Sequence, residues 1–410
     1  MRKSAIPCRR VLISIVAGLI GAGLCYSASA QNVGGDIGGG IFRPKNPETK
    51  RSTSRTPKPI TKPSRTQPKR NPNAELEGRV EDLLEKGNNA RDAKKYDEAE
   101  TAYQEVLKLK PRDARAAYGL GNVFTDQRRW DDAEKNYRDA ATWGPTNVDA
   151  LVALSVVLVQ PLSGANNARR FADAEGFAQR AVQLDPKNAV AWDRLGIALQ
   201  SRGVFTGDTE HAYRRAVELD PQFAVAYAHL ARVLKRMNRG AEGAPLYDRA
   251  IELARDPQTL VLIGESLQSE QQWDKSEGVL RKALELDARS PSTLFLLGRA
   301  LIVLKRPEEA EPYLKSTIEL SPQAFQPYTL LGQAYLALAR FDDAEKTYNS
   351  AVDIATPAER KQLAGAFGFE GVGDGYLKAK KKSDAARAYK RALDLDPGNA
   401  QLMKKLSQTK

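Results

Sequence analysis

The sequence is poor in the side chains on which metal centres and nucleophilic catalysis most often depend. Among 410 residues there are only two cysteines and two histidines. Cys8 and Cys25 both lie near the N-terminus, and the histidines are His211 and His229. Zinc sites of the common Cys/His kind and Cys–His nucleophile pairs are therefore excluded from the rest of the chain. We expect no enzymatic activity, no cofactor and no catalytic or metal-binding residues.

A glycine cluster near the C-terminus lacks the context of a phosphate-binding loop. Gly371, Gly373 and Gly375 follow one another closely, but a phosphate loop needs a strand before it and a helix opening after it. Gly373 instead falls at the small-residue position of a repeat, with Phe369 and Tyr376 at core positions of that repeat. The cluster is therefore predicted to be structural.

The chain does contain one pattern of small and bulky residues, repeated nine times between Val80 and Pro397 at a spacing near 34 residues. In the first copy a small residue, Ala99, is followed by a bulky one, Tyr103, and then by Val106. The third of these positions recurs at Val106, Ala140, Ala181, Ala216, Ala250, Ala283, Thr317, Ala351 and Ala392. A fixed period of this length predicts a stack of helix pairs, in which each pair buries its apolar face against its neighbours.

Each copy also has an upstream half with a pair like leucine–glycine, as at Leu120–Gly121, Leu195–Gly196 and Leu331–Gly332. A bulky residue three positions before the leucine places apolar side chains on one face, which predicts an amphipathic helix. The glycine is expected to let the paired helix approach closely.

These copies resemble tetratricopeptide repeats, and the resemblance covers residues 80 to about 397. It implies an all-α fold, a right-handed superhelical α-solenoid of about nine helix pairs, each formed by a helix A and a helix B. Helix A lines a concave face that usually binds peptides or other protein segments. The copies depart from the family pattern at Ser155, which replaces a glycine, and in seven extra residues near each of 161–164 and 358–364.

Composition divides the chain into four parts: a signal peptide over 1–30, a linker over 31–73, the repeats over 74–397 and a capping helix over 398–410. Residues 1–30 have basic residues, an apolar run from Val11 to Leu24, and Ala28–Ser29–Ala30. This is typical of a secretory signal cleaved after Ala30, with a periplasmic or cell-envelope location. The alternatives are an uncleaved N-terminal membrane anchor, lipidation of Cys25, and twin-arginine export through Arg9–Arg10.

The basic charge of the protein belongs to the linker and not to the repeats. The net charge of the whole chain is +12, of which the signal carries +4, Asp36 −1 and residues 43–73 +9, and from Ala74 onward it is zero. Residues 31–73 are rich in glycine and then in proline and basic residues, which predicts disorder. The linker is either a solvated spacer or a tether to anionic lipid or cell-wall polymer, and nucleic acid is an unlikely partner.

A binding site is predicted on the helix A positions that follow the Leu–Gly pair. In the first two repeats these positions hold Asn88, Arg91, Asn122 and Asp126. The middle repeats supply a basic set with an apolar floor, suited to an acidic segment or a C-terminal carboxylate: Arg194, His229, Arg232, Arg236 and Arg299, with Phe295 and Leu262. The alternative is a solvated face without a ligand.

The resemblance also implies a role as a protein–protein interaction scaffold. Some family members bind C-terminal peptides with a lysine–asparagine clamp in their first repeats. Asn88 and Asn122 match the asparagines, but the lysines are missing, so that role is not carried over. Two further roles stay open: a secretion or assembly factor of the envelope, and a regulatory or targeting module for a polysaccharide or peptidoglycan enzyme.

Overall fold

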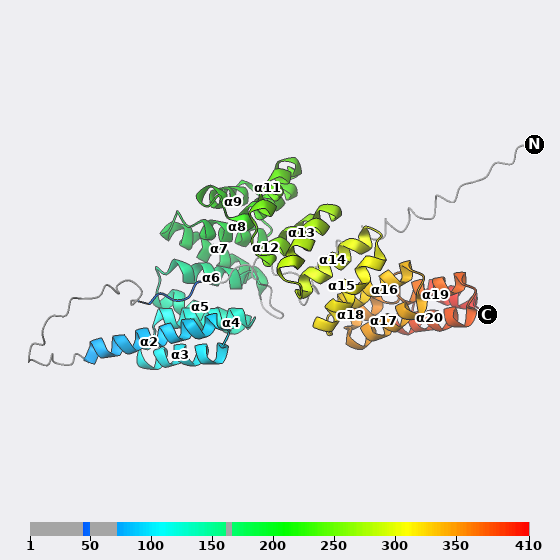
Figure 1. Cartoon of the computed structure of the whole chain (residues 1–410), viewed down its shortest axis with the longest axis horizontal. Helices are drawn as coiled ribbons and strands as arrows, with labels where there is room; N and C mark the ends of the chain where they lie inside the picture. The colour runs from blue at the N-terminus through cyan, green and yellow to red at the C-terminus, as the bar shows by residue number, and fades with distance from the viewer. Residues whose placement is uncertain (1–43, 50–71, 161–165, 410) are drawn as a thin grey trace, which may run out of the picture. The chain divides into compact units, whose positions relative to one another are not determined.

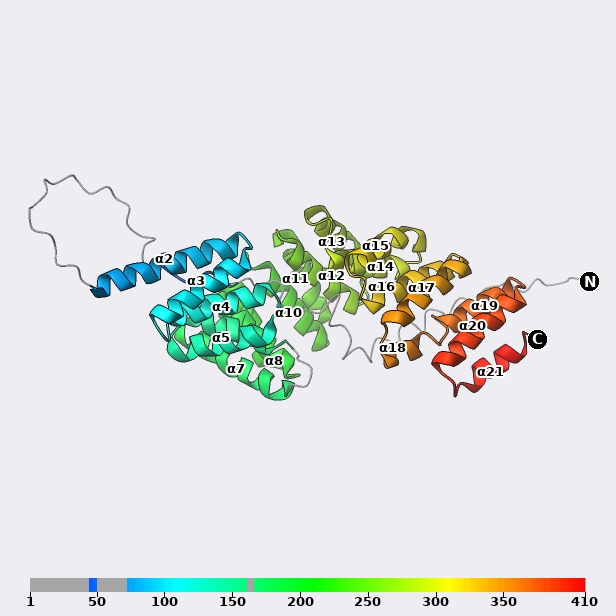
Figure 2. The same cartoon turned by 90° about the horizontal axis from the view of Figure 1, so that it is seen from below.

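The structure is a computed structural model that describes residues 44–49, 72–160 and 166–409. Over these ranges the protein is all-α, with helices joined by short turns and no β-strand (Figures 1 and 2). None of the described helices combines the length and the apolar character that a membrane span requires. The signal peptide expected at 1–30, most of the expected linker, and the extra residues at 161–164 lie outside the described residues.

Along the chain, the described helices follow one another as nine consecutive pairs, which confirms the predicted α-solenoid of about nine helix pairs. The first helices of the pairs are α2 (Pro72–Asp92), α4 (Ala114–Asp126), α6 (Val148–Leu158), α8 (Ala189–Ser201), α10 (Ala224–Arg236), α12 (Pro257–Ser269), α14 (Pro291–Val303), α16 (Phe325–Ala337) and α19 (Phe369–Lys378).

The second helices are α3 (Tyr96–Leu109), α5 (Trp130–Trp143), α7 (Asn167–Leu184), α9 (Gly207–Leu219), α11 (Gly240–Leu253), α13 (Trp273–Leu286), α15 (Pro307–Leu320), α17 (Phe341–Ile354) and α20 (Lys382–Leu395). Two of the described helices lie outside the pairs. The short α18 (Pro357–Gln362) lies among the extra residues before the last repeat, and α21 (Ala400–Ser407) follows the last repeat.

The described chain divides into two compact units, and the division falls within α12, between Ser266 and Leu267. In the first unit, each helix from α2 to α10 packs on the next helix along the chain. In the second unit, each helix from α13 to α16 does the same, and α17 then packs on α19, α19 on α20 and α20 on α21. Each unit is therefore built from contacts between neighbours in sequence, as the repeat period predicts.

The repeated positions form the core. All nine residues of the third position, from Val106 to Ala392, have 0% of their surface exposed. Residues at the bulky position of the repeat are also buried. Five of them are 0% exposed: Tyr103, Tyr137, Tyr213, Tyr348 and Tyr389. The period found in the sequence is thus the period of burial.

Each turn from a first to a second helix that the structure describes in full contains one residue in the left-handed region. Among them are Lys94, Arg128, Asn238 and Ala339, with φ of 59°, 58°, 60° and 56°. The amide of the next residue then bonds back to the end of the first helix, as Lys95 does to the carbonyl of Ala90 at 2.8 Å. This bond satisfies a carbonyl that the helix end would otherwise leave unpaired.

The glycines of the upstream halves lie against rings from the second helices. A Cβ built on Gly196 would come within 2.6 Å of the Tyr213 ring, and one on Gly373 within 2.5 Å of the Tyr389 ring. Gly373 therefore has the structural role predicted for it.

Residues 44–49 depart from the expected disorder of the linker. They have no regular secondary structure, yet Pro44 and Pro47 are buried, and the carbonyl oxygens of Pro44, Lys45 and Pro47 accept hydrogen bonds from α2 and α4. Composition could not reveal this, because it measures how much apolar surface a segment can bury on itself and not what it gains on a neighbouring surface.

Two glycine substitutions test the close approach of the helices. Gly196→Ala forces its Cβ into the Tyr213 ring, so we expect a loss of stability of about 1–3 kcal/mol. Gly176 lies in α7, and a Cβ added there would meet no atom within 4 Å. Gly176→Ala should therefore gain up to about 1 kcal/mol from helix propensity. Thermal unfolding measures both, and a destabilisation of equal size in the two variants would contradict the packing described.

Candidate functional site

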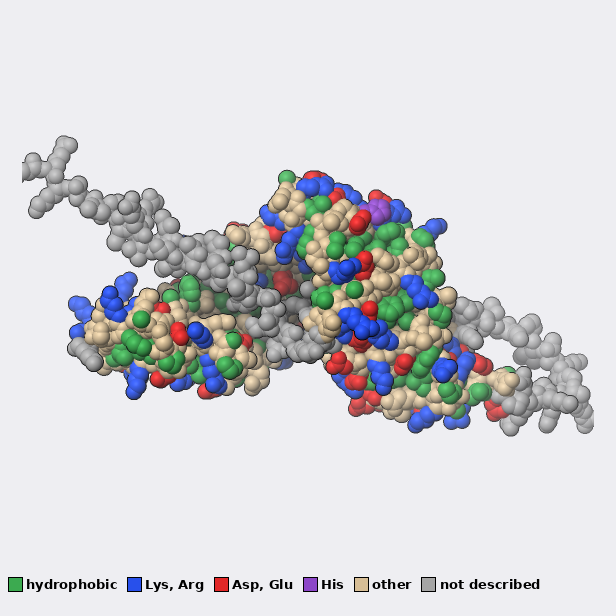
Figure 3. All heavy atoms as spheres, turned by 180° about the vertical axis from the view of Figure 1, so that it is seen from behind, with side chains coloured by type: hydrophobic (Ala, Val, Ile, Leu, Met, Phe, Trp, Pro, Cys, Tyr) green, Lys and Arg blue, Asp and Glu red, His purple; other side chains and the backbone are tan. Residues whose placement is uncertain are grey.

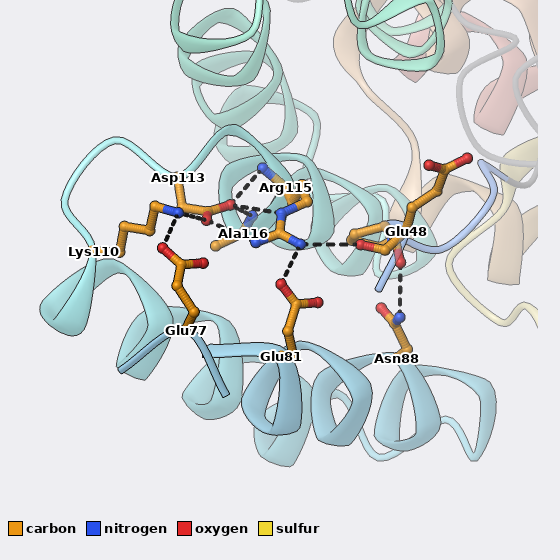
Figure 4. Close-up of polar contacts among 9 residues, drawn as sticks. Glu48, Glu77, Glu81, Asn88, Lys110, Asp113, Arg115 and Ala116 are labelled. Carbon is orange, nitrogen blue, oxygen red and sulfur yellow. Dashed lines mark hydrogen bonds and ion pairs between the residues drawn. The ribbon is translucent and has the colours of Figure 1, made fainter. Parts of the chain in front are cut away.

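The candidate site is the surface of α2 and α4 against which residues 44–49 lie. We call it the α2–α4 face, formed by Asn88, Arg91 and Asp92 of α2 and by Arg115 and Asn122 of α4. The segment and the face belong to the same compact unit. The close-up in Figure 4 shows the C-terminal part of the segment beside these helices.

Two asparagines of the face bind the main chain of the segment. Asn88 Nδ2 donates to the carbonyl oxygen of Pro47 at 2.9 Å. Asn122 Nδ2 donates to the carbonyl oxygen of Lys45 at 2.8 Å. The asparagines occupy the same position of the first and second repeats, and the carbonyls they bind are two residues apart. The repeat of the fold thus matches an alternate-residue spacing along a bound chain.

Buried tyrosines hold each asparagine amide in the orientation that binds. Tyr103 donates its hydroxyl hydrogen to Asn88 Oδ1 at 2.7 Å, and Tyr137 donates to Asn122 Oδ1 at 2.9 Å. Burial raises the pKa of both tyrosines, so the hydroxyls stay protonated and remain donors. Because Oδ1 already accepts, Nδ2 is directed toward the segment.

Arg91 supplies the third main-chain contact from a buried, paired guanidinium. The side chain is 1% exposed, and its Nε and Nη2 donate to the two carboxylate oxygens of Asp126 at 2.8 and 3.0 Å. Burial lowers the pKa of Arg91, but Asp126 outweighs it and raises that pKa above its ordinary value. This bidentate contact fixes the plane of the guanidinium group. Its Nη1 then donates to the carbonyl oxygen of Pro44 at 2.7 Å.

The segment also contributes a side chain, and its end lies beside a hollow. Asn46 Oδ1 accepts from Arg91 Nη1 at 3.0 Å, and Asn46 Nδ2 donates to Asp92 at 2.8 Å. Arg115 bonds Glu81 at 2.8 Å and approaches the carbonyl of Glu48 at 3.4 Å (Figure 4). The hollow is lined by Glu48, Thr49, Lys110, Arg112, Asp113, Ala114 and Arg115.

The charges of the α2–α4 face are balanced. Arg91 is paired with Asp126, and Arg115 with Glu81 and Asp113. On the side of the molecule drawn in Figure 3, basic and acidic side chains are likewise interspersed. The face is therefore suited to recognising hydrogen-bond acceptors of a main chain rather than a highly charged ligand.

Three residues of the predicted middle set form a cluster around a buried carboxylate. His229 Nδ1 lies 2.7 Å from Asp193 Oδ1, and Arg194 Nε lies 3.5 Å from Asp193 Oδ2. His229 and Arg194 are 1% and 3% exposed, so they do not line an open surface. Arg232 is half-buried beside them and bonds Gln200 at 2.9 Å. Asp193 offsets the basic character on which the predicted acidic partner depended.

The other members of that set, Arg236, Phe295 and Arg299, contact other residues. The exposed Arg236 stacks 5.5 Å from the Phe205 ring. Arg299 lies 5.8 Å from the ring of the buried Phe295, and its Nε donates to Gln268 at 2.6 Å. Phe295 and Arg299 belong to the second compact unit, whereas Arg194, His229, Arg232 and Arg236 belong to the first.

Sequence reasoning placed Asn88, Arg91, Asn122 and Asp126 on one surface, and the structure brings these four together. It missed the contributions of Asp92 and Arg115, and above all the segment that lies on them. Helical phase could have found Asp92, which follows Asn88 by four residues and so lies on the same face of the helix. No signal marked the segment, because it lies among similar proline- and lysine-rich residues. In the described part of the chain, no group of three or more His, Cys, Asp or Glu side chains could hold a metal ion.

Comparisons with known proteins identify the repeats. One tetratricopeptide repeat family model matches residues 84–150 and 261–325, and a second matches residues 304–366. No curated protein matches the sequence.

Several solved structures are similar at low identity. YrrB, described as a TPR protein with an unusual peptide-binding site, is 20% identical, with 48% of this chain and 97% of YrrB covered and a TM-score of 0.39. MamA from Desulfovibrio magneticus is 18% identical over 43% of this chain and 94% of its own, with a TM-score of 0.37. The C-terminal part of a TPR repeat-containing protein from Cytophaga hutchinsonii is 16% identical over 62% and 99%, with a TM-score of 0.47.

The buried histidine gives the protein a pH-dependent stability. Burial lowers the pKa of His229, Asp193 offsets this only in part, and Arg194 and Arg232 lower it further. Unfolded His229 therefore binds its proton at a higher pH than folded His229. Below the ordinary histidine pKa of about 6.5 the unfolded state gains protons, and stability falls by up to about 1.4 kcal/mol per pH unit.

Denaturant unfolding between pH 7 and pH 5 measures this dependence. His229→Gln, which can still donate to Asp193, should reduce the slope of the free energy of unfolding against pH. A slope in His229→Gln equal to that of the wild type would show that His229 is not the titrating group.

Proposed function

Because the chain belongs to the tetratricopeptide repeat family, we propose that it is a non-enzymatic protein–protein interaction scaffold whose α2–α4 face holds an extended peptide by its main chain. The observation that carries this proposal is the set of three donors on that face, Asn88, Arg91 and Asn122, each of which binds a carbonyl oxygen of residues 44–47. Each such bond contributes about 0.5–1.5 kcal/mol, and more when the donor is charged.

The face is built to accept a chain in this way. Arg91 is fixed by Asp126, and both asparagines are fixed by tyrosines whose rings lie in the core. Donors that are already oriented lose little freedom when a ligand binds. An extended peptide offers carbonyls at alternate residues, which is the spacing that Asn88 and Asn122 require.

A pair of isosteric substitutions tests the proposal in cells. Both are made in a chain that also carries Asn46→Ala, which removes the side-chain bonds of residues 44–49 to the face. Asn88→Asp keeps the Oδ1 acceptor for Tyr103 but loses the donor to the bound carbonyl, so crosslinking to partner proteins through this face should fall about tenfold. Asn89→Asp makes the same change at an exposed neighbour on α2 and should leave crosslinking unchanged. Mass spectrometry of crosslinked partners measures both variants, and partners retained in full by Asn88→Asp would contradict the proposal.

The proposal places this scaffold outside the cytoplasm, either free in the periplasm or bound to the envelope. Its support is the sequence of residues 1–30, with Arg2, Lys3, the apolar run from Val11 to Leu24, and Ala28–Ser29–Ala30. The basic charge of residues 43–73 would then lie where it can contact anionic lipid or cell-wall polymer.

The mass of the N-terminal peptide of the protein isolated from fractionated cells tests this location. We expect the mature chain to begin at Gln31 and to be recovered in the envelope or periplasmic fraction. An intact residue 1–30 segment in a cytoplasmic fraction would overturn the proposed export. An intact segment in the membrane fraction would show that residues 1–30 are retained as a membrane anchor and are not cleaved.

A further inference from the structure

The α2–α4 face contacts a specific side chain of the segment as well as its carbonyls. Asn46 is bound at both ends of its amide, since its Oδ1 accepts from Arg91 at 3.0 Å and its Nδ2 donates to Asp92 at 2.8 Å. A primary amide presents an acceptor and a donor side by side in this way. At the same reach, a carboxylate offers no donor to Asp92 and an aliphatic side chain offers neither group.

The residues that flank Asn46 fit the same surface for a different reason. Pro44 and Pro47 are buried, whereas Lys45 and Glu48 are exposed. Proline has no amide hydrogen, so burying it leaves no donor unpaired. Its carbonyl remains available, and those of Pro44 and Pro47 are both bound. The face therefore accommodates proline at two positions and asparagine between them.

We infer that residues 44–49 are a resident ligand of the α2–α4 face, and that the partner which replaces them is an extended peptide of the form Pro-x-Asn-Pro. This inference rests on the proposed function and adds to it the ligand's identity and a competition. Partner binding requires the resident segment to leave, because both use the same donors on Asn88, Arg91 and Asn122.

The competition is strong because the resident ligand is part of the same chain. The segment is joined to α2 through residues 50–71, and a ligand tethered in this way acts at an effective concentration of about millimolar. A free peptide with the same contacts must therefore be present at a comparable concentration to displace it. The wild-type protein should consequently bind such a peptide much more weakly than the face itself can.

Fluorescence polarisation with a labelled peptide, Pro-Lys-Asn-Pro-Glu-Thr, tests the inference on the full chain. Asn46→Ala removes both side-chain bonds of the resident segment and leaves the face intact. We expect this variant to bind the labelled peptide at least tenfold more tightly than the wild type. A peptide with alanine in place of asparagine should bind the same variant at least tenfold more weakly.

Two matched variants serve as controls. Lys45→Arg keeps the charge of a segment residue whose side chain is exposed and whose carbonyl is bound by Asn122, so it should bind the peptide as the wild type does. Adding Asn88→Asp to Asn46→Ala removes a donor of the face and should abolish the gain in peptide binding.

Each other outcome overturns a distinct part of the account. Equal and tight binding by the wild type and Asn46→Ala would overturn the resident ligand while leaving the proposed function in place. Equal binding of the asparagine and alanine peptides would overturn the specificity. No binding to any variant at millimolar peptide would overturn the proposed function as well. A wild-type dimer that Asn46→Ala dissociates, measured by light scattering, would show that a second copy supplies the segment.

Discussion

The structure depends on the close approach of a bulky residue of a second helix, most often a tyrosine, to a small residue of a first helix. Tyr103 of α3 shows this most directly, because a Cβ on Gly87 of α2 would come within 2.7 Å of its ring and one on Gly119 of α4 within 2.5 Å. The ring therefore lies in a space that only glycine leaves open. Its hydroxyl then reaches Asn88 at the surface. The packing that spaces the helices thus also orients the side chain that binds the segment.

The same coupling explains why the α2–α4 face is a site and not only a polar surface. Its donors are held by partners that belong to the fold: Asn88 by Tyr103, Asn122 by Tyr137, and Arg91 by Asp126. A peptide that binds meets groups already in position, so its carbonyls replace water without reorganising the protein. By contrast, the polar groups around Asp193 are buried, and the carboxylate is paired with His229 and Arg194. They contribute to stability and to its pH dependence rather than to a binding surface.

The sequence predicted the repeat architecture well, because burial in a stack of helix pairs recurs with the chain. All nine residues at the third position of the repeat, from Val106 to Ala392, are fully buried. Helical phase also brought Asn88 and Asn122 to one surface. The burial of His229 and the neutralising effect of Asp193 could not be read in the same way, since phase does not reveal which polar groups pair across neighbouring helices. The docking of residues 44–49 was missed because a contact between a linker and a distant surface has no period.

The central claim is that the α2–α4 face holds the main chain of residues 44–49, and trypsin tests it at one bond. Lys45 has an exposed side chain, but its carbonyl is bound by Asn122. The Lys45–Asn46 bond should therefore be cleaved slowly. The measurement is its rate of cleavage in the full-length protein, followed by mass spectrometry, in the wild type, Asn88→Asp and Asn89→Asp. The account predicts cleavage at least tenfold faster in Asn88→Asp and unchanged in Asn89→Asp, and an equal rate in all three proteins would contradict it.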